Sequence, residues 1–125
     1  MQLSHELPDY AFTLRSADGL TARVNDRTLS ASFILSPQQL VEDWQVGDSA
    51  TLTPDDLAPL LALKPEVILL GTGARQVFPP AAVMAACLRQ GVGLEVMTNA
   101  AAARTFNVLA GESRRVVAGF LLASA

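Results

Sequence analysis

The sequence contains few of the side chains that enzymes use for nucleophilic or metal chemistry. Its 125 residues include one cysteine, Cys87, and one histidine, His5. A lone cysteine excludes a disulfide within the chain and fits a reducing compartment. One histidine and one cysteine cannot supply a histidine-based triad or a complete zinc or iron ligand set. We therefore assign no catalytic residue, no metal site and no cofactor from the sequence.

Charge is also scarce, and no apolar run is long. Charged residues make up 17% of the chain, and the net charge is −3. This balance argues against a nucleic-acid partner, because phosphate binding needs clustered basic residues and only Arg114 and Arg115 are adjacent. No stretch approaches the roughly 18 apolar residues of a membrane span. The amino terminus, MQLSHELPDY, is unlike a signal peptide, so we predict a cytoplasmic protein without a membrane span.

Half of the residues are hydrophobic, which indicates a packed core. The length fits a single domain over residues 1–125, with residues 1–9 as a flexible leader.

The first half has the pattern of strands. Residues 10–15 and 20–24 flank Asp18-Gly19, a dipeptide typical of hairpin turns. Residues 27–35 alternate apolar side chains onto one face, which predicts one longer strand. Residues 40–44 fit a short strand or a turn of helix equally well. We expect this half to form a β-meander that joins the main sheet or packs beside it.

The second half alternates strands and helices, which predicts an α/β domain. Thr53 and Pro54 begin a short or kinked helix, and residues 65–73 read as a strand covered on both faces. A helix over residues 80–90 should bury Val83, Met84, Cys87 and Leu88. A short strand at 93–97, a helix at 99–110 and a last strand at 114–122 follow. The strands at 67–70 and 94–97 should be parallel.

A ligand site in such a sheet is expected beyond the carboxyl ends of the parallel strands. Gly71, Thr72, Gly73 and Arg75 follow one strand there. Gln76 and the late helix start break the Rossmann spacing, and the Walker pattern is absent. We interpret GTG as a tight turn first and as the edge of a pocket second.

Four further residues complete the candidate pocket. Glu95 lies on a strand that we expect helices to cover, so it should pair with an arginine or line a solvent-filled opening. Thr98 is explained as a helix cap, Thr105 shares its helical stripe, and Asn107 has no local structural reason inside a helix.

The residues GTG and GVGLEVMTNAAAARTFNVLAGESRRVVAGFLL resemble a family of small α/β domains of unknown biochemical activity. Its eukaryotic members include a mitochondrial respiratory complex I assembly factor and an adipogenesis-associated protein. The resemblance covers residues 67–122 and implies a three-layer domain with a central mixed sheet flanked by helices. It also implies that the last strand runs antiparallel to its neighbours.

Three functions remain open on this basis. The first is a non-enzymatic binding or assembly module with an unidentified protein partner. The second is a small-molecule or anion site at the GTG turn, and the third is an enzyme with Glu95 as acid or base. Self-association through an exposed edge strand also stays open.

Overall fold

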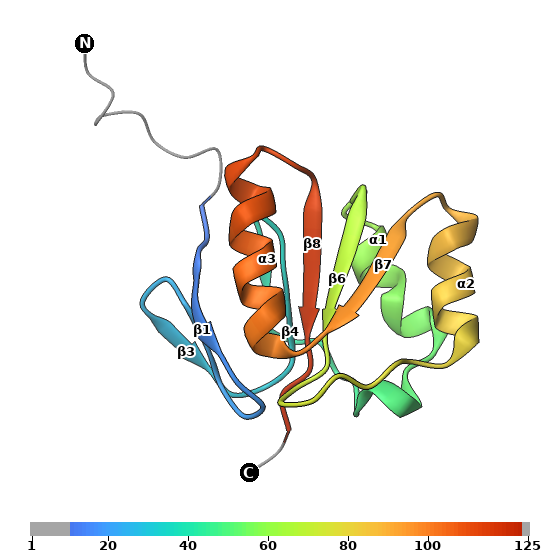
Figure 1. The fold of residues 1–125 in the computed structure, drawn as a ribbon, viewed down its shortest axis with the longest axis horizontal. Helices are drawn as coiled ribbons and strands as arrows, with labels where there is room; N and C mark the ends of the chain where they lie inside the picture. The colour runs from blue at the N-terminus through green and yellow to red at the C-terminus, as the bar shows by residue number, and fades with distance from the viewer. Residues whose placement is uncertain (1–10, 124–125) are drawn as a thin grey trace.

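The computed structural model describes residues 11–123, so the predicted leader at residues 1–9, with His5, lies outside the described part. The described residues form two sheets and three α-helices (Figure 1). In the first half lie β1 (Leu14–Ala17), β2 (Ala22–Val24), β3 (Arg27–Leu29), β4 (Phe33–Leu35), β5 (Leu40–Val41), and the 3-10 helices η2 (Ser49–Thr51) and η3 (Pro54–Leu57). In the second half lie α1 (Ala58–Leu61), β6 (Val67–Gly71), α2 (Ala81–Arg89), β7 (Gly93–Met97), α3 (Asn99–Gly111) and β8 (Val116–Phe120).

The main sheet has the order β5-β4-β8-β6-β7. Strand β6 pairs in parallel with both β7 and β8, and all five of its residues are buried, as the apolar sequence predicts. Strand β8 is antiparallel to β4 but parallel to β6, so the expectation that it opposes both neighbours is wrong. The reason is α3, whose crossover returns the chain from β7 to the amino end of the sheet.

Alternation along the strands divides the core into two clusters. Val67 and Leu69 of β6 face α3 and the small sheet, whereas Ile68 and Leu70 face α1 and α2. The sheet is therefore the middle of three layers, with α3 on one side and α1 and α2 on the other (Figure 1). The predicted fold class, α/β with a mixed central sheet flanked by helices, is confirmed.

The predicted meander forms its own sheet, β1-β2-β3, beside the main one. Asp18 closes its first hairpin, because the carboxylate accepts hydrogen bonds from the backbone N–H groups of Thr21 and Leu20, both at 2.8 Å. These bonds, that of Thr21 first, lower the pKa of the Asp18 carboxyl. The small sheet contributes Leu14 and Val24 to the cluster around α3.

Two predicted elements differ from the structure. Residues 27–35 form two strands, β3 and β4, because one pairs with β2 and the other with β8. Leu88 is not buried in the stripe of α2 but 74% exposed, while Val83 and Cys87 are buried. The undecided segment at residues 40–44 contains the short strand β5.

The Trp44 side chain packs against β8, the middle strand of the main sheet. Trp44 is buried, and its Nε1 donates a hydrogen bond to the carbonyl oxygen of Asp56 at 3.0 Å. A Cβ atom added to Gly119 of β8 would lie 2.7 Å from the Trp44 ring. A side chain at this position of β8 would therefore displace the indole.

Helices α1 and α3 both end in residues with left-handed backbone that are not glycine. Ser113 (φ 60°) follows α3, and the Arg114 N–H bonds the Leu109 carbonyl, as in a Schellman cap. Lys64 (φ 56°) follows α1. A Cβ atom in this conformation is strained, and glycine is the residue that relieves it.

We expect Lys64→Gly to raise the free energy of unfolding by about 0.5–1 kcal/mol, because it removes this strain and keeps the backbone hydrogen bonds. Urea unfolding measures the change. Lys64→Ala is the matched control, since it removes the same side chain but retains the strained Cβ. An equal gain in both variants would contradict the explanation.

Candidate functional site

The GTG turn is held by one buried amide, that of Asn99 at the start of α3. Its Oδ1 accepts a hydrogen bond from the Gly73 N–H at 3.1 Å. Its Nδ2 donates to the carbonyl oxygens of Asp18 at 2.8 Å and Leu121 at 2.9 Å. The side chain is fully buried, so these bonds replace water completely. Asn99 therefore joins the GTG turn, the first hairpin and the end of β8.

Both glycines of the turn are required by this arrangement. A Cβ atom on Gly71 would collide with Oδ1 of Asn99 and lie 3.2 Å from a ring carbon of Phe120. Gly73 has a φ of 103°, which side chains rarely adopt. Gly71 is therefore required for room beside the Asn99 amide, and Gly73 for the positive φ of the turn.

Thr72 fixes the loop that follows. Its hydroxyl donates a hydrogen bond to the Arg75 carbonyl at 2.6 Å and accepts one from the Val77 N–H at 3.0 Å. The Gln76 amide donates to the Val96 carbonyl of β7 at 2.8 Å, and the Ser49 hydroxyl donates to the Val77 carbonyl at 2.7 Å. These bonds hold the loop against β7 and η2.

The same loop presents apolar side chains to solvent. Phe78 is 61% exposed and Val77 is 39% exposed, although both follow a segment with a fixed backbone. We call residues 74–78 the rim loop. Phe78 is not among the residues predicted from the sequence. Its position between the GTG turn and two prolines is the signal that could have identified it.

The predicted pocket residues do not all meet in one place. Thr72 and Gly73 line a hollow of about 540 Å³ together with Gly47, Asp48 and residues 121–123. Asn107 lines a different hollow, of about 290 Å³, between β1 and α3. The side chains of Arg75 and Glu95 are exposed, and Thr105 is half-buried on α3.

Glu95 differs most from expectation. Strand β7 is at the edge of the sheet, and Glu95 is exposed on it rather than covered by helices. Among residues 11–123 it forms no ion pair with any arginine, and one nearby candidate, Arg114, pairs with Glu66 instead. The topology explains this exposure. Helix α3 leads the chain to β8 on the far side of β6, so β7 has one neighbouring strand.

Thr98 and Asn107 have structural roles. The Thr98 side chain accepts a hydrogen bond from the Ala101 N–H at 3.2 Å, as expected of a helix cap. The Asn107 amide donates to the Leu14 carbonyl at 2.7 Å and accepts from the Leu14 N–H at 3.0 Å. Asn107 thus bonds the small sheet to α3 as a neighbouring strand would.

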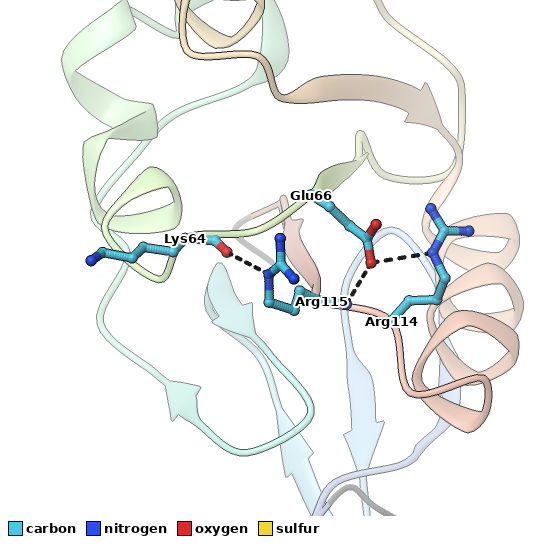
Figure 2. Close-up of polar contacts among 4 residues, drawn as sticks. All are labelled: Lys64, Glu66, Arg114 and Arg115. Atoms are coloured by element: carbon cyan, nitrogen blue, oxygen red, sulfur yellow. Dashed lines mark hydrogen bonds and ion pairs between the residues drawn. The ribbon is translucent and has the colours of Figure 1, made fainter.

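The opposite end of the sheet carries a cluster of charged residues (Figure 2). One carboxylate oxygen of Glu66 accepts hydrogen bonds from the Arg115 N–H at 2.9 Å and from Nε of Arg114 at 3.2 Å. The Arg115 N–H first and the Arg114 guanidinium second lower the pKa of the Glu66 carboxyl. Nε of Arg115 donates to the Lys64 carbonyl at 3.3 Å.

Reactive and metal-binding groups are not gathered in the described part of the chain. No group of three or more His, Cys, Asp or Glu side chains there could hold a metal ion. Cys87 is buried between α2, on which it lies, and the sheet, and this burial raises the pKa of its thiol. No helix within residues 11–123 is long and apolar enough to cross a membrane.

Comparison with known proteins agrees with this fold. A family model described as "Protein of unknown function (DUF498/DUF598)" matches residues 15–121. A solved structure from Xanthomonas campestris is 56% identical, with a TM-score of 0.83, over 98% of this chain and 92% of that one. The resemblance drawn from the sequence is confirmed.

Two curated relatives carry different names. The "13 kDa major membrane protein" of Francisella tularensis is 33% identical over 88 residues, which are 70% of this chain and 68% of that protein. The "NADH dehydrogenase (ubiquinone) 1 alpha subcomplex assembly factor 3" of Danio rerio is 30% identical over 100 residues. These cover 78% of this chain but 57% of the fish protein.

We predict that Asn99→Ala lowers the free energy of unfolding by about 3 kcal/mol, because one buried N–H and two carbonyl groups lose their partner. Asn107→Ala, which removes two hydrogen bonds from a half-buried site, should cost about 1 kcal/mol. Chemical denaturation compares the two variants.

The collision at Gly71 makes this prediction sharper. Gly71→Ala should cost much more in the wild type than in the Asn99→Ala background, where the obstructing oxygen is gone. We expect a coupling energy of about 1–3 kcal/mol from the double-mutant cycle. Additive costs would contradict the role assigned to the glycine.

The lowered pKa of the Glu66 carboxyl predicts that the stability of the fold depends on pH. Its folded-state pKa is lowered, so its charged form stabilises the fold above the unfolded pKa, and this contribution is lost as the pH falls through the folded pKa. At neutral pH the wild type should therefore be more stable than Glu66→Gln. The difference should shrink below pH about 4.5 and vanish in stronger acid. Urea unfolding across this range measures it, with Glu112→Gln, at the end of α3, as control.

Proposed function

Since the chain belongs to the family described as "Protein of unknown function (DUF498/DUF598)", we propose that it is a non-enzymatic module that binds another protein during assembly. The family description leaves the activity open. Support for assembly comes from the relative named as an assembly factor, with which this chain shares 30% identity. The chain spans little more than half of that protein, so the proposal concerns the shared region alone.

The observation that carries the proposal is the exposed ring of Phe78, which directly follows a backbone segment held by side-chain hydrogen bonds. Interface hot spots are enriched in aromatic side chains that are fixed before binding, because little conformational entropy is then lost. Thr72 and Ser49 hold the backbone at Val77 by side-chain hydrogen bonds, yet Phe78 is 61% exposed. Burying such a ring against a partner would stabilise a complex.

The outer edge of β7 lies next to the rim loop. Strand β7 pairs with β6 on one side and has no strand on the other within the described sheet. The Gln76 amide, which bonds the Val96 carbonyl, brings the loop against the carboxyl end of this strand. A partner could add a strand along the part of β7 before Val96, whose carbonyl Gln76 already occupies, while covering Phe78. We propose a different protein with an apolar surface as the occupant, in keeping with an assembly role.

An enzyme that uses Glu95 has less support. A general acid or base needs a substrate held within hydrogen-bond reach and sheltered from water. Glu95 is exposed on an edge strand and is not among the residues that line the hollow at the GTG turn.

The hollow at the GTG turn favours a second candidate, a small-molecule site. It measures about 540 Å³, and Asp48 is the one charged residue in its lining. A carboxylate there opposes anion binding and favours a neutral or cationic compound. A thermal-shift screen of the protein with a panel of metabolites tests this candidate. If no compound raises the melting temperature of the protein, the candidate is removed.

We expect Phe78→Ser to weaken the complex with the partner by about thirtyfold or more, because hot-spot truncation removes about 2 kcal/mol of binding energy. A photo-crosslinking residue at Val77 identifies the partner, and titration of the purified proteins measures the dissociation constant. The Phe78 side chain is exposed to solvent, so the variant should retain its fold.

Val108→Ser is the matched control, because Val108 is 58% exposed on α3, away from the rim loop. The proposal predicts a defined complex that Phe78→Ser weakens and Val108→Ser does not. Two results would overturn it: binding that is indifferent to Phe78, or a crosslink at Val77 that joins two copies of this chain.

A further inference from the structure

The amino ends of β6 and β8 border a hollow of about 320 Å³, at the opposite end of these strands from the rim loop. Its lining contains two charged side chains, Arg114 and Arg115, and no acid. This is notable in a chain with a net charge of −3. The Glu66 carboxylate lies beside the arginines but outside the lining, so the concave surface keeps an excess of positive charge, which attracts anions.

The two arginines are not equivalent. Arg114 donates from Nε to the Glu66 carboxylate, so its charge already has a partner. Arg115 donates from Nε to a neutral carbonyl, that of Lys64, and its hydrogen bonds with Glu66 run through its backbone. Its positive charge still lies close enough to help lower the pKa of the Glu66 carboxyl. Figure 2 shows the Arg115 guanidinium group beside the Lys64 carbonyl. The bond to Lys64 orients the guanidinium plane, and no hydrogen bond within residues 11–123 occupies its terminal Nη atoms.

The rest of the lining is mostly apolar. Besides the arginines, six of its lining residues are apolar, namely Pro37, Leu63, Pro65, Ala110, Val116 and Val117. The other four are polar, namely Ser36, Gln38, Gln39 and Ser113. A ligand that fits would carry its charge at one end and an apolar body at the other. The volume is at the low end of the range for small-molecule pockets, about 300–1,000 Å³.

We propose that this hollow binds a carboxylate carried on a short apolar stem, with Arg115 as the recognising residue. A carboxylate matches the planar guanidinium fork. It also brings one negative charge to a cluster of two arginines and one glutamate, Arg114, Arg115 and Glu66, whose net charge is +1. A phosphate would bring nearly two. The carboxylate belongs either to a free organic acid or to the carboxyl-terminal apolar residue of a peptide.

The test titrates the protein with hexanoate and with the tripeptide acetyl-Ala-Ala-Leu, each paired with its neutral amide. Backbone amide shifts in NMR report the site of binding, which we expect at residues 36–39 and 113–117. Both carboxylates should bind and both amides should not, and the tighter carboxylate identifies the source. Hexyl phosphate is the third probe, and tighter binding of the phosphate would overturn the carboxylate assignment.

Arg115→Gln should weaken carboxylate binding about tenfold or more, because the charge-assisted hydrogen bonds are lost. The backbone bonds between Arg115 and Glu66 do not use the side chain, so the fold should persist. Arg89→Gln, an equal charge change on the exposed face of α2, should leave binding unchanged. Arg115→Lys, which keeps the charge without the fork, should bind with intermediate affinity.

Equal weakening in Arg115→Gln and Arg89→Gln, or shifts away from this hollow, would overturn the proposal. It does not rest on the proposed function, because the rim loop lies at the other end of the sheet. Phe78→Ser should leave hexanoate binding unchanged, so the two ideas fail separately.

Discussion

The buried amide of Asn99 is the constraint on which one end of the molecule depends. It satisfies backbone groups of Gly73, Asp18 and Leu121, which lie in three separate segments. A buried amide with every hydrogen bond formed specifies one arrangement of its neighbours, because each alternative leaves a polar group unpaired. Gly71 is glycine for the same reason, since a Cβ atom would occupy the space of the amide oxygen.

The two ends of the parallel strands are built with different chemistry. Neutral amides and hydroxyls fix the carboxyl end, where Thr72 holds the rim loop. Charged groups fix the amino end, where Glu66, just before β6, accepts hydrogen bonds from Arg114 and Arg115, just before β8. A neutral network is insensitive to pH and salt, whereas an exposed charged one responds to both. A change in pH or salt should therefore act on the Glu66 cluster more than on the hydrogen bonds of Asn99 and Thr72.

Periodicity was enough to predict the alternating strands and helices of the second half, and the resemblance implied the three layers, but neither predicted the contacts between distant segments. The apolar run of β6 and the caps at Thr53 and Thr98 are local signals, and the structure agrees with them. The exposure of Glu95 depends on which strand lies at the edge, which a local pattern does not encode. Likewise, Asn107 looks unexplained within its helix, because its partner Leu14 is 93 residues away.

The packing of Trp44 over Gly119 gives the protein an internal optical probe. The chain has one tryptophan, and its indole lies against the backbone of β8, which separates the antiparallel and parallel parts of the sheet. Tryptophan fluorescence therefore originates from one site, without interference from a second indole. Any event that separates β4 from β8, or loosens η3 from the sheet, would expose that ring to water and shift its emission to longer wavelength.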